Sequence, residues 1–354
     1  MNINFLCQFN NTGVGRHSEN AFFGMARVRP KGVAVNYVDS SNQGAVERLV
    51  ASCRTDRDVT LQFWRTSRQL LDRLRGQRVV WQHFETDKLP PRWIDELDAF
   101  DRVWMPSEWA RTVALAHGLA PAKVQTVPAG VNERIFYPRP VPHEGFRFLS
   151  VGKYEARKSI DESIAAFREE FPRATFPQLQ FWLKADFPMF PDRVVKLRER
   201  LADDDRFRVI SGELSDFEMA QLYNQADAFV FASKAEGFGL PCIEAMACGV
   251  PVLATCYSGQ TIFLEPAAGL FIPVDYAIGP IVDADFSYFY TVEFGGTDFG
   301  NWAIPTVAAI RKAMRAAFDE SASWKDKARQ ASEIVRSRFS WDEIGRRAIA
   351  QLAA

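Results

Sequence analysis

Short runs of β-branched and aromatic residues alternate with segments of helical periodicity through the first 140 residues. Such alternation is typical of parallel strands joined by crossover helices. We therefore expect an α/β sheet in this part of the chain. Its predicted strands are Ile3–Phe9, Val59–Phe63, Val79–Gln82, Val103–Met105 and Val124–Val127.

The segment Tyr137–Gly145 has neither a helical nor a strand period, and it contains Pro138, Pro140 and Pro142. Prolines and glycine at this density indicate a linker. We place a domain boundary here, between residues 1–140 and residues 141–340.

The alternation restarts after the linker, which predicts a second parallel sheet. A chain of 354 residues exceeds the usual size of one hydrophobic core, in agreement with two domains. One helix is expected from Pro241, which suits the first helical position, to Gly249, which suits a left-handed cap. The predicted strands are Phe146–Val151, Leu179–Leu183, Arg208–Ile210, Ala228–Ala232 and Pro251–Ala254.

Two serines stand where a capping box would begin a helix. Ser159 with Glu162, and Ser215 with Glu218, have the required spacing. We expect each serine side chain to accept a hydrogen bond from the backbone N–H three residues further on.

The segment Asp283–Asn301 is rich in aromatic residues, glycines and aspartates in short alternating pieces. This pattern favours a hairpin-like insertion over a layer of the core. Helices are expected after it, over Pro305–Glu320 and Trp341–Leu352.

The composition is that of a globular protein, with 47% hydrophobic and 25% charged residues. None of the five cysteines forms a CxxC pair near histidines, so we expect reduced core thiols and no metal ligands. The start of the chain has no basic leader before an apolar run, which predicts a cytoplasmic protein.

Positive charge is concentrated in the first part of the chain, where residues 1–140 carry 19 Lys/Arg against 14 Asp/Glu. The segment Arg48–Arg78 alone contains eight arginines and three aspartates. The simplest interpretation of this excess of positive charge is a solvent-exposed face. A surface that contacts an anionic membrane or nucleic acid is the alternative.

The segment Asn11–His17 (NTGVGRH) directly follows the first predicted strand and precedes a helix. Gly13 and Gly15 would let the backbone approach a phosphate closely there. Ser18 stands where the dinucleotide-binding fingerprint has its third glycine. A structural tight turn is therefore an equal alternative for this loop.

The segment Glu236–Glu244 (EGFGLPCIE) places backbone amides and a helix N-terminus at the carboxyl edge of the second sheet, where anions bind. The carboxylates of Glu236 and Glu244 oppose that preference unless they accept hydrogen bonds from hydroxyl groups. A sugar or ribose supplies hydroxyl donors in pairs. A simple contact with the helix dipole is the alternative, above all for Glu244.

Three cations follow the predicted strand Phe146–Val151 at the same edge. Lys153, Arg157 and Lys158 in this position can hold a diphosphate.

Taken together, Glu236–Val252 (EGFGLPCIEAMACGVPV) and Val151–Lys158 (VGKYEARK) resemble the retaining glycosyltransferases of family four, the glycosyl transferases group 1. The combination is highly specific. Further stretches similar to the family are Thr12–His17, Trp104–Trp109 (WMPSEW), Val127–Asn132 (VPAGVN) and Phe339–Asp342 (FSWD).

The resemblance implies the GT-B fold class, an α/β architecture in which two Rossmann-like parallel-sheet domains face a central cleft. Residues 1–140 would form the acceptor-side domain, with a C-terminal helix of about residues 341–354 packing back onto it. Residues 141–340 would bind the donor, a nucleotide-diphosphate-sugar for which a UDP- or GDP-sugar is expected. No further cofactor is implied.

The family pattern also implies residue roles. Lys153 and Lys158 would hold the diphosphate. Glu236 would bind the hexose that is transferred, and Glu244 would bind the ribose hydroxyls. The other implied donor-binding residues are Gly13 and Gly15, on the far side of the diphosphate, with Arg157, Gly237, Phe238, Gly239 and Leu240.

His83, in the segment WQHFETD, matches a family histidine that reaches the sugar near the reaction centre; a structural role is the alternative. Two positions depart from the family pattern, which commonly has arginine at Lys153 and glycine at Ser159. Lysine keeps the charge but loses the bidentate fork of arginine.

The implied reaction is a retaining transfer to an acceptor hydroxyl, in which the lysines stabilise charge on the departing diphosphate. We expect no metal requirement. A metal-dependent transferase is the first alternative, because residues 56–58 (DRD) and 283–285 (DAD) have the DxD form.

The expected acceptor is a saccharide or a lipid-linked saccharide, with peripheral contact with an anionic membrane in the second case. Modified (hydroxymethylated) nucleic acid is a minority alternative. The sequence is also compatible with a nucleotide-sugar binding protein without catalysis, and with a dehydrogenase that uses the Gly13/Gly15 loop.

Overall fold

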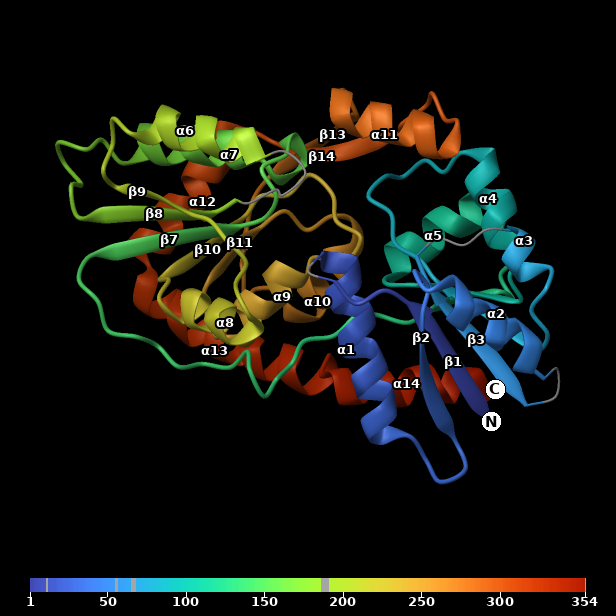
Figure 1. Cartoon of the computed structure of the whole chain (residues 1–354). Helices are drawn as coiled ribbons and strands as arrows, with labels where there is room; N and C mark the ends of the chain where they lie inside the picture. The colour runs from blue at the N-terminus through green and yellow to red at the C-terminus, as the bar shows by residue number, and fades with distance from the viewer. Residues whose placement is uncertain (11, 55–56, 65–67, 186–190, 354) are drawn as a thin grey trace. The chain divides into compact units, whose positions relative to one another are not determined.

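The computed structural model describes residues 1–10, 12–54, 57–64, 68–185 and 191–353, which fall into two compact units (Figure 1). Unit 1 comprises Met1–Asn132, Ala284–Gly300 and Ser337–Ala354. Unit 2 comprises Glu133–Asp283 and Asn301–Arg336. Each unit contains a six-stranded sheet, and none of the helices in the described ranges is long and apolar enough to cross a membrane.

The sheet of unit 1 is parallel throughout and has the strand order β2-β1-β3-β4-β5-β6. The strands predicted for this part of the chain are confirmed. Strand β2 was not predicted, because it is a half-exposed edge strand without a clear apolar alternation. The strands are β1 (Asn2–Cys7), β2 (Ala34–Asp39), β3 (Asp58–Phe63), β4 (Gln77–Trp81), β5 (Arg102–Met105) and β6 (Val124–Thr126).

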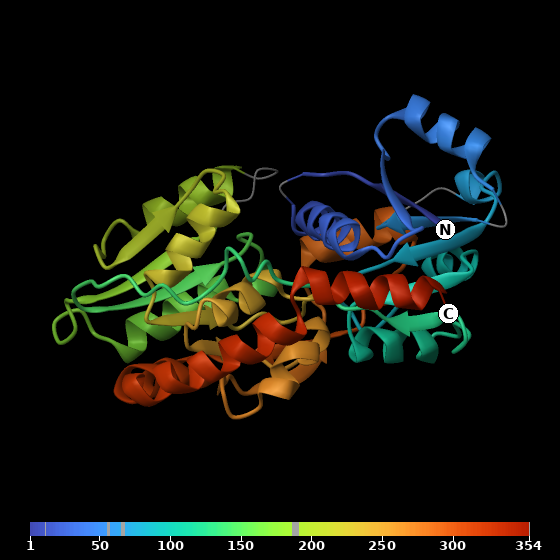
Figure 2. The same cartoon turned by 90° about the horizontal axis from the view of Figure 1, so that it is seen from below.

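Helices α1 and α14 of unit 1 lie side by side in both views (Figures 1 and 2). Glycine permits this approach, because a Cβ atom on Gly24 would lie 2.4 Å from the carbonyl oxygen of Trp341. The C-terminal helix therefore packs against the helix that follows β1. The helices of unit 1 are α1 (Gly13–Val28), α2 (Gln43–Ser52), α3 (Arg68–Leu71), α4 (Pro91–Asp98), α5 (Glu108–Ala116), α11 (Ala284–Phe294) and α14 (Trp341–Ala353).

The segment Asp283–Asn301 contains helix α11, so the hairpin predicted there is wrong. Antiparallel strands β13 (Tyr276–Pro280) and β14 (Asn301–Pro305) pair with each other on either side of it in the sequence. Packing against α4 stabilises this helix. Phe294 stacks on Trp93 of α4, with ring centroids 4.0 Å apart and ring planes at 7° to each other. This segment clusters with unit 1, whereas the boundary expected from the sequence includes it among residues 141–340.

The sheet of unit 2 is also parallel, in the order β12-β11-β10-β7-β8-β9, and the five predicted strands are confirmed. From β7 the chain adds strands on one side up to β9, and then returns to add β10–β12 on the other side. The strands are β7 (Phe146–Val151), β8 (Leu179–Lys184), β9 (Phe207–Ile210), β10 (Ala228–Phe231), β11 (Val252–Ala254) and β12 (Ile272–Pro273).

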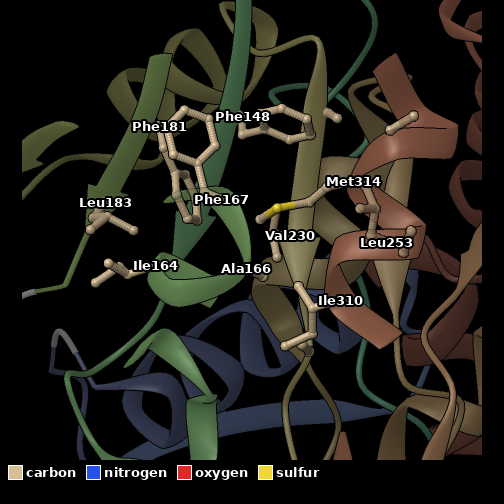
Figure 3. Close-up of a cluster of buried hydrophobic side chains, with 14 of the residues drawn as sticks. Phe148, Ile164, Ala166, Phe167, Phe181, Leu183, Val230, Leu253, Ile310 and Met314 are labelled. Atoms are coloured by element: carbon tan, nitrogen blue, oxygen red, sulfur yellow. The ribbon is translucent and has the colours of Figure 1, made fainter. Parts of the chain in front are cut away.

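Helices cover both faces of this sheet, with α6 and α7 on one face and α8 and α9 on the other (Figure 1). Figure 3 shows the core under α6, where the rings of Phe148, Phe167 and Phe181 meet Met314 of α12. The helices are α6 (Ile160–Glu170), α7 (Pro191–Leu201), α8 (Asp216–Asn224), α9 (Leu240–Ala247), α10 (Thr261–Leu264), α12 (Val307–Asp319) and α13 (Ser321–Arg338), with short 3₁₀ turns at Ala156–Lys158, Ser258–Gln260 and Glu265–Ala267.

One of the two predicted capping boxes is present. Ser215 accepts a hydrogen bond from the Glu218 N–H, and Glu218 accepts one from the Ser215 N–H. The box predicted at Ser159 is wrong. Ser159 ends the 3₁₀ turn Ala156–Lys158 in the left-handed region, with φ 51°, and its hydroxyl has no hydrogen-bond partner among the described residues.

Candidate functional site

The loops after β7 and β10 meet at one point of the unit 2 sheet. These two strands are parallel neighbours, and the strand order reverses between them. Ligands of parallel α/β sheets bind at such a switch point, beyond the carboxyl ends of the strands. The predicted cations follow β7, and Glu236 follows β10, so both predicted groups lie at this edge.

Glu236 is the centre of a buried ion cluster. Its Oε1 atom lies 2.5 Å from Lys158 Nζ and accepts a hydrogen bond of 2.5 Å from Ser233 Oγ. Its Oε2 atom lies 3.1 Å from Arg157 Nη1. The Glu236 side chain is 7% exposed, and that of Lys158 11%. The structure thus joins three predicted residues, while Lys153 is exposed in the turn after β7.

Glu236 is ionised in this cluster. Burial alone would raise the pKa of Glu236, but the positive charges of Lys158 and Arg157 outweigh it and lower the pKa to about 2. The pKa of Lys158 is lowered, chiefly by burial, against the attraction of Glu236. The cluster is therefore a dry, charged site in which two cations face one carboxylate.

Two hydrogen bonds from the loop after β11 fix the backbone of Glu236. The Glu236 N–H donates to Ser258 Oγ at 2.8 Å, and the Gly259 N–H donates to the Glu236 carbonyl at 2.9 Å. A Cβ atom on Gly259 would lie 2.2 Å from the carbonyl oxygen of Gly237, so this contact requires glycine. Ser233, Ser258 and Gly259 were not predicted from the sequence; the adjacent serine and glycine in the loop that follows the predicted strand Pro251–Ala254 were the available signal.

Glycine also allows the turn that leads into α9. Gly239, the N-cap residue, has φ +97°, which favours glycine. Phe238 is buried and packs against the edge of Phe263, with centroids 5.3 Å apart, and α9 begins at Leu240. The predicted left-handed position at Gly249 is confirmed, with φ +70°.

Glu244 lies on α9 and is half-buried. Its Oε2 atom accepts a hydrogen bond of 2.9 Å from the hydroxyl of Tyr223 on α8. Burial, with the charge of Glu244, raises the pKa of Tyr223 well above its ordinary value, so the hydroxyl remains a donor. Tyr223 was not predicted from the sequence, because 21 residues separate the two positions.

Gly13 and Gly15 open helix α1 of unit 1. A Cβ atom on Gly15 would lie 2.2 Å from Asn10 Oδ1, whereas one on Gly13 would meet no described atom within 4 Å. The Gly15 N–H donates to the Thr12 hydroxyl, the N-cap of the helix, at 3.1 Å. Packing therefore requires glycine at Gly15, while Gly13 lies in open space.

His83 is buried in unit 1 beside a second histidine. Its Nε2 atom lies 2.8 Å from Nδ1 of His17, which follows the Gly13/Gly15 turn in α1. Burial lowers the pKa of His83 to about 3 and that of His17 well below its ordinary value. Both rings are therefore neutral, and a single proton lies between these two nitrogens. The sequence pointed to His83 and to the stretch that ends at His17, but not to the pair.

The two aspartate triplets show no metal-ligand arrangement in the part of the chain that the structure describes. Residue 56 lies outside that part. The Asp58 carboxylate accepts hydrogen bonds from Asn2 Nδ2 at 2.9 Å and from the Arg54 N–H at 2.8 Å, which ties β3 to its surroundings.

Residues 131–277, which include the whole Lys158–Glu236 cluster, match the family model of the glycosyl transferases group 1. This part of the chain is similar to that family. A D-inositol 3-phosphate glycosyltransferase 1 of Catenulispora acidiphila is 30% identical over 182 residues, 46% of this chain and 43% of the relative. A D-inositol 3-phosphate glycosyltransferase of Mycobacterium tuberculosis is 26% identical over 206 residues, which are 54% of this chain and 41% of the relative. The chain thus matches only about two fifths of the length of these relatives.

Solved structures resemble the chain over its whole length. HepE of Anabaena, in complex with UDP and glucose, has a TM-score of 0.72 at 16% identity, covering 100% of this chain and 99% of its own. Sucrose-phosphate synthase from Thermosynechococcus elongatus has a TM-score of 0.73 at 17% identity, covering 100% and 98%. The fold of the chain is GT-B, with two Rossmann-like domains, as expected from the sequence.

Proposed function

We propose that this protein is a retaining glycosyltransferase that moves a sugar from a nucleotide-diphosphate-sugar to a hydroxyl group of its acceptor. The observation that carries the proposal is the buried cluster of Lys158, Arg157 and Glu236 at the switch point of unit 2. The match of residues 131–277 to the family model of the glycosyl transferases group 1 supports it. HepE, which shares the fold, is solved with UDP and glucose.

The cluster suits a ligand that carries both charge and hydroxyl groups. A diphosphate would engage the buried Lys158 and Arg157, together with the exposed Lys153, because ammonium and guanidinium groups form strong charge-assisted bonds to phosphate. Glu236, ionised at neutral pH, would accept hydrogen bonds from hydroxyls of the sugar. Further contacts are proposed from Gly13, Gly237, Phe238, Gly239, Leu240 and Glu244, and from the turn at Gly15.

The chemical step is proposed to depend on charge stabilisation. The bond from the anomeric carbon to the diphosphate oxygen breaks, and the acceptor oxygen bonds to that carbon from the same face. Lys158 and Lys153 stabilise the charge that develops on the diphosphate, which takes the acceptor's proton. We propose that His83 contacts the sugar. Fixed charges in a dry site act strongly because they need no reorganisation during the reaction.

We propose a saccharide or lipid-linked saccharide as acceptor, bound on the unit 1 side, and a UDP- or GDP-sugar as donor. Nucleic acid is less favoured, because part of the arginine excess is compensated within unit 1. Arg73 pairs with Glu47, and Arg78 with Asp101 at 2.9 Å. The proposed setting is the cytoplasm, with peripheral membrane contact if the acceptor is lipid-linked.

The test is a transfer assay with UDP-, GDP-, ADP- and dTDP-sugars and a panel of saccharide acceptors. The anomeric configuration of donor and product is compared by proton NMR. We expect one donor to be consumed with retained configuration, with the same rate in EDTA. An inverted product would contradict retention, and turnover lost in EDTA but restored by manganese would contradict metal independence.

A further inference from the structure

Tyr223 and Glu244 form a hydrogen-bonded pair between neighbouring helices of unit 2. Tyr223 lies on α8 and is fully buried, and Glu244 lies on α9 and is half-buried. The Tyr223 hydroxyl donates to Glu244 Oε2 at 2.9 Å. One end of the pair is thus fixed in the core, and the other end is partly exposed.

The ring of Tyr223 is held by aromatic neighbours. Phe229 of β10 and Phe136 both contact it edge-on, with centroids 5.5 Å and 6.1 Å away. The capping box at Ser215 and Glu218 fixes the start of the same helix. A ring held in this way gives its hydroxyl one position, so the hydroxyl can orient a flexible partner.

The bond from Tyr223 restricts the rotamers of Glu244, a long side chain whose ordering costs conformational entropy. A carboxylate can accept about four hydrogen bonds, so the bond from Tyr223 orients Glu244 without using up its capacity. Glu244 lies about one turn into α9, the helix that begins at Leu240 after the loop holding Glu236. A fixed carboxylate in this place is suited to accept hydrogen bonds from ligand hydroxyls.

An oriented carboxylate discriminates between ligands more strongly than a mobile one. A ligand that lacks the hydroxyl leaves the carboxylate partly desolvated and unpaired, and this penalty is largest when the side chain cannot turn back to water. A mobile glutamate would relax and lose most of the discrimination.

We propose that Tyr223 is a positioning residue which, by fixing Glu244, makes the site select ribonucleotides over their deoxy counterparts. The inference rests on the proposed function, because it needs a nucleotide at the switch point of unit 2. It assigns to a buried core tyrosine a part in donor specificity.

Calorimetric titration of UDP, GDP and ADP, and of their 2′-deoxy and 3′-deoxy counterparts, tests the inference. In the unmodified protein, we expect one ribonucleotide to bind, and to bind about tenfold more tightly than at least one of its deoxy counterparts. The quantity compared between variants is this ratio of dissociation constants. In Tyr223→Phe, which keeps the ring, we expect the ratio to fall below about threefold. Tyr290→Phe is the matched control, because Tyr290 is a buried tyrosine of unit 1 whose hydroxyl donates to the Lys88 carbonyl at 3.0 Å.

Equal affinities for ribo- and deoxynucleotides in the unmodified protein, or an unchanged ratio in Tyr223→Phe, would overturn the inference. Glu244→Gln gives a second test that does not depend on the folding of Tyr223→Phe, since an unchanged ratio there also overturns it. If the unmodified protein binds none of the nucleotides, the proposed function itself is contradicted.

Discussion

Nε2 of His83 lies 2.8 Å from Nδ1 of His17, and the remaining ring nitrogen of each histidine has no hydrogen-bond partner among the described residues. Aromatic rings surround the pair. The ring centroids of Phe63 and Trp81 lie 4.6 Å and 4.8 Å from the ring centroid of His17. No charged form is favoured in such surroundings, because burial removes the solvent that would stabilise it. The pair is therefore a neutral unit in the core of unit 1.

This burial predicts how stability depends on pH. The pKa of both histidines is lower in the folded than in the unfolded state, so the unfolded chain binds more protons below about pH 6.5. Their contribution is fully present above pH 6.5 and is lost as pH falls toward 3. Each histidine adds about 1.4 kcal/mol per pH unit to the slope of the unfolding free energy.

His17→Asn removes one titrating group but keeps a polar atom near the position of Nδ1. Urea denaturation between pH 6 and pH 4.5 should show a slope smaller by about 1.4 kcal/mol per pH unit than that of the unmodified protein. Equal slopes would mean that His17 is not a buried neutral group in the folded state.

Glu236→Gln is predicted to abolish transfer and also to weaken the fold. Lys158 and Arg157 would remain buried without their carboxylate, and breaking a buried pair in this way costs about 3 kcal/mol. Asp204→Asn is the matched control, because it breaks the buried Arg206–Asp204 pair away from the switch point. Thermal melting should show a loss in both variants, and a transfer assay only in Glu236→Gln. Normal turnover in Glu236→Gln would contradict the site assignment.

Ser159→Gly is predicted to stabilise the protein. Ser159 adopts φ 51°, a region that favours glycine, and its buried hydroxyl has no partner within the described ranges. Glycine should raise the unfolding free energy by about 0.5–1 kcal/mol, after allowance for its greater freedom in the unfolded chain. Ser159→Ala, which keeps the strain, should gain less in the same denaturation experiment. A lower melting temperature for Ser159→Gly than for Ser159→Ala would refute this explanation.

Phe294→Ala is predicted to loosen the segment that follows His83. Phe294 of α11 stacks on Trp93. Tyr290 of the same helix donates a hydrogen bond from its hydroxyl to the Lys88 carbonyl. Removing the ring should cost about 3–5 kcal/mol and speed hydrogen exchange in residues 86–93. The strands of unit 2 serve as the internal reference. Unchanged exchange in residues 86–93 would show that the stack does not hold this segment.

The parts of the fold that could be predicted are those that local patterns determine. Buried strands appear as short apolar runs, and the Ser215–Glu218 box needs only neighbouring residues. The box expected at Ser159 failed because this residue ends a 3₁₀ turn in a left-handed conformation. Helix α11 was missed because its aromatic residues pack against Trp93, far away in the sequence.

The same distinction applies to the site. Lys158, Arg157 and Glu236 could be predicted to meet, because they follow strands of one parallel sheet. The side chains that contact Glu244 and His83 could not be predicted. Tyr223 and His17 reach their partners across 21 and 66 residues, and no local pattern specifies such contacts.

The proposed function depends above all on the binding of a nucleotide sugar at the Lys158–Glu236 cluster. Thermal shifts are measured with UDP-, GDP-, ADP- and dTDP-sugars for the unmodified protein, Lys158→Met and a control, Lys325→Met. Lys325 also pairs with an aspartate, Asp227, which directly precedes β10 at the opposite end of that strand. Because a ligand that binds only the folded state raises the melting temperature, one donor should do so in the unmodified protein and in Lys325→Met, but not in Lys158→Met. Saturable binding of NADH or NADPH with no shift from any nucleotide sugar, or an undiminished shift in Lys158→Met, would contradict the account.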